Sequence, residues 1–319
     1  MDTTAVKKTI KLYFTDFWKG FDACHNVFTE TLSRHYTIKM DPNPDYLFFS
    51  SFGYDHLNHR DCIKIYFTGE NNVPDFNLCD YALGFHFLEF GDRYLRFPVY
   101  LLDKEVQRLE LERQIDPANA LNRKFCNFVY TNNKLSDPIR EICFRKLSEY
   151  KQVDSGGRLL NNIGAPVPQK LPFIRDYKFT IAFENSCVQG YTTEKMTDPM
   201  RVDSLPVYWG NPAVESDFNK AAFVHVNDFA TIDAAIAEVI RLDRDDEAYL
   251  KQLSQPRFSE TGYYQCQLNR LEVFLRAIVE QPLEQARRTA AYGYAQRYFA
   301  RQKKMAKLLS FKPLSFILR

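Results

Sequence analysis

Residues 179–210 read FTIAFENSCVQGYTTEKMTDPMRVDSLPVYWG. The stretch begins with an apolar run at 179–183 and ends with a second one at 205–208, and both runs have the length and composition of buried strands. A segment of helical length, near 193–202, lies between them. A strand, a loop, a helix and a second strand in this order are typical of one unit of a parallel α/β sheet.

The same alternation extends in both directions from this unit. Further strands are predicted at 10–14, 46–50, 63–68, 81–87 and 125–131, and further helices at 138–150 and 267–280. A charge-dense stretch at 103–122 interrupts the pattern, so we place the connection between two domains there. We therefore predict an α/β protein with two Rossmann-like domains that face each other across a cleft. The predicted regions are a first domain at 1–118, a second domain at 119–280 and a basic helical tail at 281–319.

The composition is that of a folded globular protein, with 26% charged, 45% apolar and 15% aromatic residues among 319. No stretch approaches the roughly 18 consecutive apolar residues that a membrane-spanning helix requires. Lys11 and Asp16 interrupt the apolar residues that follow the first lysines, so no secretory signal peptide is predicted. We therefore expect a cytoplasmic protein.

Positive charge is concentrated at the C-terminal end. No acidic residue follows Glu284, whereas nine basic residues do, and aromatic and aliphatic residues are interspersed among them. This composition is typical of a basic amphipathic segment on an anionic membrane surface, here the inner face of the membrane. The alternative is a helix whose apolar side packs on the body of the protein. The remainder of the chain is mildly acidic, which argues against general binding of nucleic acid.

Within residues 179–210, polar residues lie at the end of the first predicted strand and at the start of the predicted helix. Glu184 and Asn185 follow the first strand, Gly190 lies in the loop, and Glu194 and Lys195 open the helix. Unpaired backbone N–H groups at a helix N-terminus, together with a lysine, suit a phosphate group. The alternative is an ordinary N-capped surface helix with solvated charges.

Several motifs match a family pattern in order along the chain. They are Phe183-Glu184-Asn185, Gly190-Tyr191-Thr192-Thr193-Glu194-Lys195, Pro206-Val207-Tyr208-Trp209-Gly210, Phe67-Thr68-Gly69-Glu70-Asn71, Asp80-Tyr81-Ala82-Leu83-Gly84-Phe85, Arg93-Tyr94-Leu95-Arg96-Phe97-Pro98, Asp154-Ser155-Gly156-Gly157-Arg158 and Asp217-Phe218-Asn219. Together they resemble the α1,3/4-fucosyltransferases of microbial type, which use GDP-fucose. The resemblance implies a GT-B fold, in which the N-terminal domain receives the acceptor and the C-terminal domain holds the nucleotide sugar.

The resemblance also implies which residue acts as the catalytic base. Glu70 corresponds to the family's proposed base, which takes the proton of the acceptor hydroxyl as the new bond forms. Asp75 and Asp80 are nearby carboxylates that could share or replace this role. The alternative for Glu70 itself is an ordinary loop carboxylate in a turn.

Five residues correspond to positions of the family's donor site. Arg140 and Lys195 match its phosphate-binding residues, where an arginine offers a bidentate fork and a lysine a point charge. Glu194 and Tyr191 match donor-site positions, where Glu194 would bond sugar hydroxyls or support a positive transition state, and Asn185 is a further assignment. The sequence departs from the pattern at Asp198-Pro199, where the family usually continues Asp-Ala.

Pro199 leaves two possibilities for the predicted helix, because proline disfavours the α conformation at the residue before it. Either the helix begins late, with Asp198 as its N-cap, or it is kinked at Pro199. In the first case Glu194 and Lys195 would lie on a loop. The orientation of these two side chains toward a phosphate would then depend on the conformation of that loop.

No metal site or cofactor is expected. Asp243-Arg244-Asp245 is similar to the Asp-x-Asp metal motif, but its charged surroundings predict a solvated helix start. His56, His59 and Cys62 have ligand-like spacing without an apparent fourth ligand. A divalent cation would act only as a stimulant that pairs with GDP.

The hypothesis is an inverting α1,3-fucosyltransferase that moves L-fucose from GDP-fucose to the 3-OH of GlcNAc in an N-acetyllactosamine-type glycan. Its product would be a Lewis x-type antigen, on a lipopolysaccharide or a glycan built on a lipid carrier. The expected partners are GDP-fucose, the GlcNAc-containing acceptor and a membrane surface. The alternatives are an α1,4-fucosyltransferase, a glycosyltransferase with another nucleotide sugar, and a non-catalytic nucleotide-sugar or glycan-binding protein.

Overall fold

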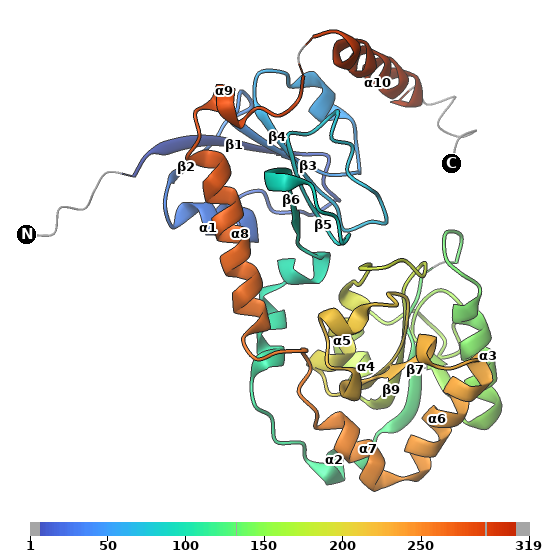
Figure 1. The fold of residues 1–319 in the computed structure, drawn as a ribbon. Helices are drawn as coiled ribbons and strands as arrows, with labels where there is room; N and C mark the ends of the chain where they lie inside the picture. Colours follow the sequence, from blue (N-terminus) through green and yellow to red (C-terminus); the bar gives the residue numbers. More distant parts are fainter. Residues whose placement is uncertain (1–6, 132, 291, 311–319) are drawn as a thin grey trace, which may run out of the picture. The chain divides into compact units, whose positions relative to one another are not determined.

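The computed structural model of the protein has two compact units (Figure 1). Unit 1 comprises Met1–Phe97 and Gln267–Arg319, and unit 2 comprises Pro98–Cys266. The structure describes residues 7–131, 133–290 and 292–310. Each unit is built around one sheet of parallel strands, which confirms the predicted α/β class.

Unit 1 has a six-stranded sheet in the order β2-β1-β3-β4-β5-β6. Its strands are β1 (Thr9–Thr15), β2 (Thr37–Met40), β3 (Tyr46–Phe49), β4 (Ile63–Phe67), β5 (Tyr81–Gly84) and β6 (Tyr94–Arg96). Every residue of β3, β4 and β5 is buried, as expected for parallel strands that are covered on both faces. The register places Phe48 opposite Ile65, and Ile65 opposite Tyr81.

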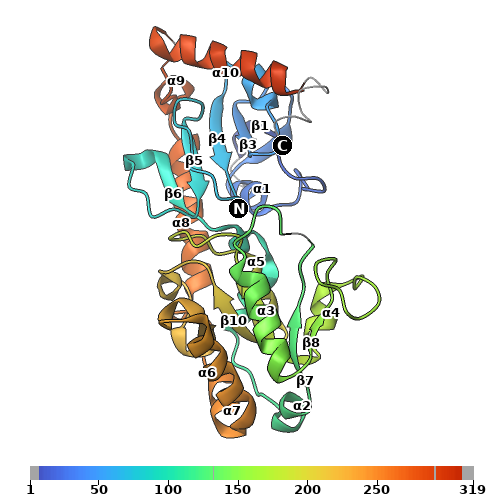
Figure 2. The same cartoon turned by 90° about the vertical axis from the view of Figure 1, so that its right-hand side faces the viewer.

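The helical elements of unit 1 come from both ends of the chain. They are α1 (Val27–Ser33), the 3-10 helices η1 (Asp55–Asn58) and η2 (Gly91–Arg93), most of α8 (Tyr263–Val279), α9 (Leu283–Ala286) and α10 (Tyr294–Ser310). Figure 2 shows α10 near β4 of the unit 1 sheet, and α10 also contacts η1. No helix of the described residues is long and apolar enough to cross a membrane.

Unit 2 has a five-stranded sheet in the order β11-β10-β9-β7-β8. Its strands are β7 (Lys124–Phe128), β8 (Val153–Ser155), β9 (Tyr177–Phe183), β10 (Leu205–Trp209) and β11 (Val224–His225). Its helices are α2 (Pro117–Leu121), α3 (Ile139–Tyr150), α4 (Lys170–Ile174), α5 (Glu194–Arg201), α6 (Ile232–Arg244) and α7 (Asp246–Leu253), with 3-10 helices η3 (Val99–Leu102), η4 (Lys104–Glu110), η5 (Val214–Ser216), η6 (Lys220–Ala222) and η7 (Val226–Asp228).

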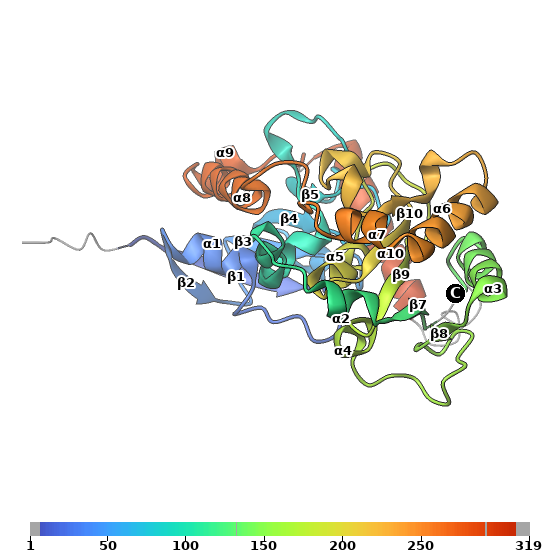
Figure 3. The same cartoon turned by 90° about the horizontal axis from the view of Figure 1, so that it is seen from below.

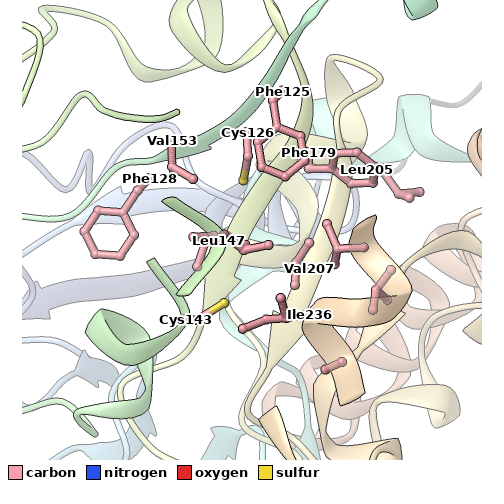
Figure 4. Close-up of a cluster of buried hydrophobic side chains, with 14 of the residues drawn as sticks. Phe125, Cys126, Phe128, Cys143, Leu147, Val153, Phe179, Leu205, Val207 and Ile236 are labelled. Carbon is pink, nitrogen blue, oxygen red and sulfur yellow. The ribbon is translucent and has the colours of Figure 1, made fainter. Parts of the chain in front are cut away.

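The core of unit 2 lies between its sheet and the helices α3 and α6. Phe179 and Val207 project from the central strands toward Leu147 of α3 and Ile236 of α6 (Figure 4). The helices α4 and α5 contact the strands from the other side (Figure 3). The sheet is therefore covered on both faces, and its central strand β9 is buried along its whole length.

The boundary between the units lies earlier than the expected division at 118/119. The first unit ends at Phe97, because the segment that follows packs on unit 2. Asp103 pairs with Arg201 of α5 at 2.6 Å, and Arg113 pairs with Asp203. The charge-dense stretch is therefore part of the second unit rather than a linker.

The chain returns to unit 1 at Gln267 rather than ending its second domain at 280. Glu272 of α8 accepts hydrogen bonds from the side chains of Arg34 and His35. The tail expected at 281–319 is not a separate region either, as far as the structure describes it, to Ser310. Its backbone at Arg288 and Thr289 donates to the carboxylate of Asp80, so this part of the tail is built into unit 1.

Candidate active site

Helix α5 begins at Glu194 and continues through Pro199 to Arg201. Thr193 is its N-cap, with extended backbone dihedral angles, and the Thr193 hydroxyl oxygen accepts a hydrogen bond from the Lys195 N–H. The late start with Asp198 as N-cap is therefore wrong. Because the Thr193 cap fixes the first turn upstream of the proline, Glu194 and Lys195 lie on the helix.

Glu184 lies just after β9 and is fully buried. One carboxylate oxygen accepts from the backbone N–H of Thr193 at 2.8 Å, and the other accepts from the Thr193 hydroxyl at 2.8 Å. Burial raises the pKa of Glu184 above its ordinary value, and the nearby ammonium of Lys195 opposes that rise only in part. Glu184 thus joins the end of the strand to the start of the helix, a role that the sequence analysis did not assign to it.

The ammonium of Lys195 reaches back over the cap of its own helix. It lies 3.1 Å from the Thr193 hydroxyl, 3.4 Å from a carboxylate oxygen of Glu184 and 3.5 Å from one of Glu194. Burial alone would lower the pKa of Lys195, but the two carboxylates outweigh it and hold that pKa above its ordinary value. Lys195 is therefore a fixed positive charge at the N-terminus of α5.

Arg140 lies on α3 and is 2% exposed. Its Nη2 donates to the backbone carbonyls of Phe183 and Glu184 at 3.2 and 3.1 Å, and to Oδ1 of Asn185 at 2.8 Å. Its guanidinium carbon lies 4.0 Å from the ring centre of Tyr130. Arg140 and Asn185 are thus brought together, and both fasten the segment that follows β9.

Tyr130 is a residue of this cluster that the sequence analysis missed. Its hydroxyl donates to the carbonyl of Ile181 at 2.9 Å and accepts from the backbone N–H of Phe183 at 2.7 Å. Burial raises the pKa of Tyr130 to about 12, so it stays a neutral donor. A Cβ added to Gly157 would lie 1.9 Å from the Tyr130 carbonyl oxygen, which explains the glycine there. No sequence signal marks Tyr130, because it is one aromatic residue among many.

Glu194 and Tyr191 differ in their surroundings. The side chain of Glu194 is 57% exposed, and the cations Lys195 and Lys170 lower the pKa of Glu194 against a desolvation effect that would raise it. Tyr191 is buried, and it follows Gly190, whose φ of 87° lies in the left-handed region that glycine tolerates best. The Gly190 N–H donates to Oδ1 of Asn211 at 2.7 Å, which fixes the turn.

A small pocket opens beside this cluster. It is lined by Tyr130, Lys170, Glu194 and Lys195, together with residues of β9 and Val129, which follows β7. Lys170 is held by Asp198 of α5 at 2.7 Å. Two ammonium groups and a helix N-terminus therefore converge on one opening, an arrangement that can bind a phosphate group.

Glu70 belongs to unit 1, whereas the other five predicted site residues belong to unit 2. It follows β4 and is exposed, and its backbone N–H donates to the Thr68 hydroxyl at 3.0 Å. Among the residues that the structure describes, the Glu70 carboxylate makes no hydrogen bond or ion pair. It is thus available to accept a proton from a substrate.

The two alternative bases are engaged elsewhere. Asp80 is 1% exposed, and it accepts from the backbone N–H groups of Lys64, Arg288 and Thr289. Asp75 accepts from the Tyr298 hydroxyl at 2.6 Å. Both carboxylates therefore fasten the C-terminal segment to unit 1, which favours Glu70 over them.

The two metal-like patterns have structural partners. Asp245 caps α7, as predicted, but Asp243 is buried between Lys151 and Lys178, which contradicts a solvated helix start for that residue. His56 lies 2.7 Å from Asp16, and His59 lies 3.4 Å from Asp55. Within the described ranges, no group of three or more histidine, cysteine or acidic residues could hold a metal ion.

Two family models match the chain. The "Alpha-(1,3)-fucosyltransferase FucT N-terminal domain" matches residues 12–103, and "Glycosyltransferase family 10 (fucosyltransferase) C-term" matches residues 120–263. Between them they cover most of both units.

Relatives of known identity agree with these models. The Helicobacter pylori "Alpha-(1,3)-fucosyltransferase FucT" is 34% identical over 70% of this chain and 54% of its own length. The human "GDP-fucose protein O-fucosyltransferase 3" is 29% identical over 72% of this chain and 52% of its own length. The chain thus spans about half the length of these two relatives.

A solved structure extends the likeness to three dimensions. The "Crystal Structure of alpha1,3-Fucosyltransferase with GDP-fucose" is 29% identical, covers 86% of this chain and 92% of its own, and superposes with a TM-score of 0.70. The two parallel-sheet units therefore correspond to the two Rossmann-like domains of a GT-B glycosyltransferase. On the family models, the relatives and the fold, the chain belongs to glycosyltransferase family 10, the fucosyltransferases.

Proposed function

We propose that the chain transfers L-fucose from GDP-fucose to the 3-hydroxyl of GlcNAc in an N-acetyllactosamine-type glycan, with inversion at the anomeric carbon. The observation that carries this proposal is the network of Glu184, Thr193 and Lys195 at the start of α5. It holds a positive charge at a helix N-terminus in a member of a fucosyltransferase family. A GDP-fucose complex of a similar structure supports the choice of donor.

The donor site would act on the charge that develops as GDP leaves. When the bond between the anomeric carbon and the β-phosphate oxygen breaks, negative charge builds on that phosphate. Lys195 already lies between two carboxylates, so a phosphate would meet a cation whose position is set before binding. Arg140 would act through the backbone of Phe183 and Glu184 that it fastens, in addition to its own charge.

Tyr191, Glu194 and Asn185 complete the proposed donor site. The exposed carboxylate of Glu194 would accept hydrogen bonds from hydroxyl groups of the sugar, or stabilise the positive charge of an oxocarbenium-like transition state. Tyr191 is held by its buried turn, and Asn185 by Arg140. The reaction as proposed needs no metal or cofactor, and a divalent cation would only stimulate it by pairing with GDP.

The base in this proposal is Glu70. The acceptor oxygen attacks the anomeric carbon on the face opposite GDP, the bond to the phosphate breaks, and the hydroxyl proton passes to the Glu70 carboxylate. Such general-base help contributes about 10² to 10⁴ in rate. The exposed Glu70 carboxylate lies at the carboxyl end of β4, where α/β sheets usually bind their ligands.

The acceptor and the cellular location are the finer parts of the proposal. The name of the Helicobacter pylori relative supports the α1,3 linkage, and with it a Lewis x-type product on a lipopolysaccharide or lipid-linked glycan. The basic helix α10 supports a location on the cytoplasmic face of a membrane. The human relative's name favours a second candidate, in which the acceptor is a protein hydroxyl.

The test is product analysis with GDP-fucose and a panel of type 1 and type 2 N-acetyllactosamine acceptors, by mass spectrometry and NMR linkage determination. We expect α1,3-linked fucose on the type 2 chain. An α1,4 product on type 1 would keep the donor and change the linkage, and transfer only to a peptide hydroxyl would favour the second candidate. GDP binding with no transfer from any nucleotide sugar would contradict catalysis.

Glu70→Gln tests the base within the same assay. We expect it to lose about 10² to 10⁴ in turnover, since the amide cannot take the proton. Its affinity for GDP should stay at the wild-type value, because the proposed donor site lies in the other unit. Wild-type turnover in Glu70→Gln would remove Glu70 from the mechanism.

A further inference from the structure

Unit 1 contains a polar pocket that is separate from the small pocket described in unit 2. Its volume is about 260 Å³, and β4, the segment before β5, and the α9–α10 region line it. Three basic residues contribute to the lining: Arg60, Lys64 and Arg287. None of the six predicted catalytic and donor-site residues is among the residues that line it.

Lys64 is the most unusual of these residues. It is the second residue of β4 and is 6% exposed. Its ammonium lies 4.8 Å from the ring centre of Phe299 on α10, and among the described residues it forms no hydrogen bond or ion pair. Burial lowers the pKa of Lys64 to about 8. A buried cation without an anionic contact is costly unless a ligand supplies the anion.

Arg60 and Arg287 strengthen the positive charge of the pocket. The guanidinium of Arg60 lies 4.8 Å from the ring centre of Phe299, so the same ring faces Arg60 and Lys64. Within the described part of the chain, neither arginine side chain forms an ion pair or a hydrogen bond. Three cations therefore line one pocket, and no carboxylate of the described residues is paired with any of them.

Two carboxylates also belong to the lining, and among the described residues neither forms an ion pair with these three cations. The oxygens of Asp80 accept from the backbone of Lys64, Arg288 and Thr289. Asp61 is exposed, and it makes no ion pair within the described residues. The pocket therefore keeps an excess of positive charge.

We propose that this pocket binds the phosphate group of an organic phosphate ester. Arginine forks and a lysine point charge suit phosphate oxygens, and Gln296 adds an amide donor to the lining. The pocket is larger than a phosphate ion requires, and its remaining wall contains Leu78, Phe299 and Tyr292. The organic part of the ligand lies against these apolar and aromatic side chains.

The direct test is titration of the full chain with inorganic phosphate, followed by calorimetry and by the shift in melting temperature. Lys64→Met keeps the length and packing of the side chain and removes its charge. We expect it to weaken phosphate binding about ten- to a hundredfold, as loss of a charged hydrogen bond does. Lys39→Met, on the exposed edge strand β2 of the same sheet, is the matched control and should bind like the wild type.

The donor site could also bind inorganic phosphate, so Lys195→Met is included to separate the two sites. Loss of all phosphate binding in Lys195→Met, with wild-type binding in Lys64→Met, would overturn the proposal. Arg287→Gln is a second variant at a half-buried position, in case Lys64→Met fails to fold. It should also weaken phosphate binding, and wild-type binding in both folded variants would equally overturn the proposal.

Vesicles distinguish the source of the phosphate ester. Sedimentation with phosphatidylcholine vesicles, with and without phosphatidic acid, tests a lipid headgroup. Binding that requires phosphatidic acid, is competed by inorganic phosphate and is lost in Lys64→Met would identify a lipid source. Binding of inorganic phosphate without vesicle binding would identify a soluble phosphorylated metabolite.

Discussion

Two lysines, one in each unit, have opposite surroundings. Lys195, at the start of α5 in unit 2, lies within 3.5 Å of Glu184, Glu194 and the Thr193 hydroxyl. Lys64, on β4 in unit 1, faces the ring of Phe299 and makes no ion pair with any described residue. The pKa of Lys195 is accordingly held above its ordinary value, whereas burial lowers that of Lys64 to about 8.

The difference shows that the partner, rather than burial, decides what a buried lysine can do. Lys195 has its charge fixed and its position set by carboxylates of the same chain, and the proposed function uses it as a cation that is in place before a phosphate binds. Lys64 carries the desolvation cost without that compensation. Variants that remove a partner or a lysine therefore test the comparison directly.

The largest effect is expected from removing the partner of Lys195. Glu184→Ala should lower the free energy of unfolding by about 3 kcal/mol, because it leaves a largely buried ammonium without its buried carboxylate and removes the bonds to Thr193. Chemical denaturation followed by circular dichroism measures it. Glu194→Ala is the matched control, since its exposed carboxylate should be worth at most about 1 kcal/mol. Equal effects of the two variants would contradict the role of Glu184.

The two lysines should respond to the same substitution with opposite signs. Lys195→Met should destabilise the protein by about 2 kcal/mol, because Glu184 would stay buried without its cation. Lys64→Met should leave the free energy of unfolding unchanged or raise it, because it removes an uncompensated buried charge. Thermal and denaturant unfolding of both variants in phosphate-free buffer is the measurement. Strong destabilisation by Lys64→Met would show that Lys64 has a stabilising partner.

The stability of the wild type should depend on pH through Lys64. The folded pKa of about 8 lies below the ordinary lysine value, so the unfolded chain binds more protons between these two values. The Lys64 contribution therefore rises with pH through that window, by about 3 kcal/mol, and is unfavourable below it. Cys62, Asp80, Arg60 and Arg287 are the charged or titratable groups that act on Lys64. Denaturation of wild type and Lys64→Met across this pH range should show the difference between them shrinking, and a constant difference would contradict the assignment.

The smallest effect is expected at the helix cap beside Lys195. Thr193→Ala should cost about 1 kcal/mol, since it removes the N-cap of α5 and a donor to Glu184. Thr193→Ser keeps the hydroxyl and should restore most of that loss. Unfolding measurements on the pair separate the cap from the packing of the threonine methyl group. Failure of serine to restore stability would assign the loss to packing.

The central elements of both sheets could be predicted because their sequences are locally distinctive. The strands β3, β4, β9 and β10 are short, mostly apolar runs, and the Thr193 cap marks the start of α5. The strands β6, β8 and β11 have only two or three residues, too few for a periodic pattern. They form because a neighbouring strand supplies backbone hydrogen-bond partners. That neighbour is set by the tertiary structure and cannot be recognised in the local sequence.

The residues of the site could be predicted only where they belong to a sequence motif, and the contacts between them could not be predicted. Arg140 and Asn185 do come together, but the contact joins α3 to the end of β9 across 45 positions of sequence. The burial of Lys64 depends on Phe299, more than two hundred residues later, so no local pattern could show it. The burial of Asp243 could not be predicted for the same reason, because its partners Lys151 and Lys178 belong to elements that are distant in the sequence.

The central claim is that Lys195 holds the phosphates of the donor while Glu70 serves the acceptor. Calorimetric titration of GDP into wild type, Lys195→Met and Glu70→Gln tests it most directly, at a temperature where circular dichroism shows all three folded. The account predicts wild-type affinity for Glu70→Gln and about ten- to a hundredfold weaker binding for Lys195→Met. Wild-type affinity in Lys195→Met, or loss of GDP binding in Glu70→Gln, would contradict it.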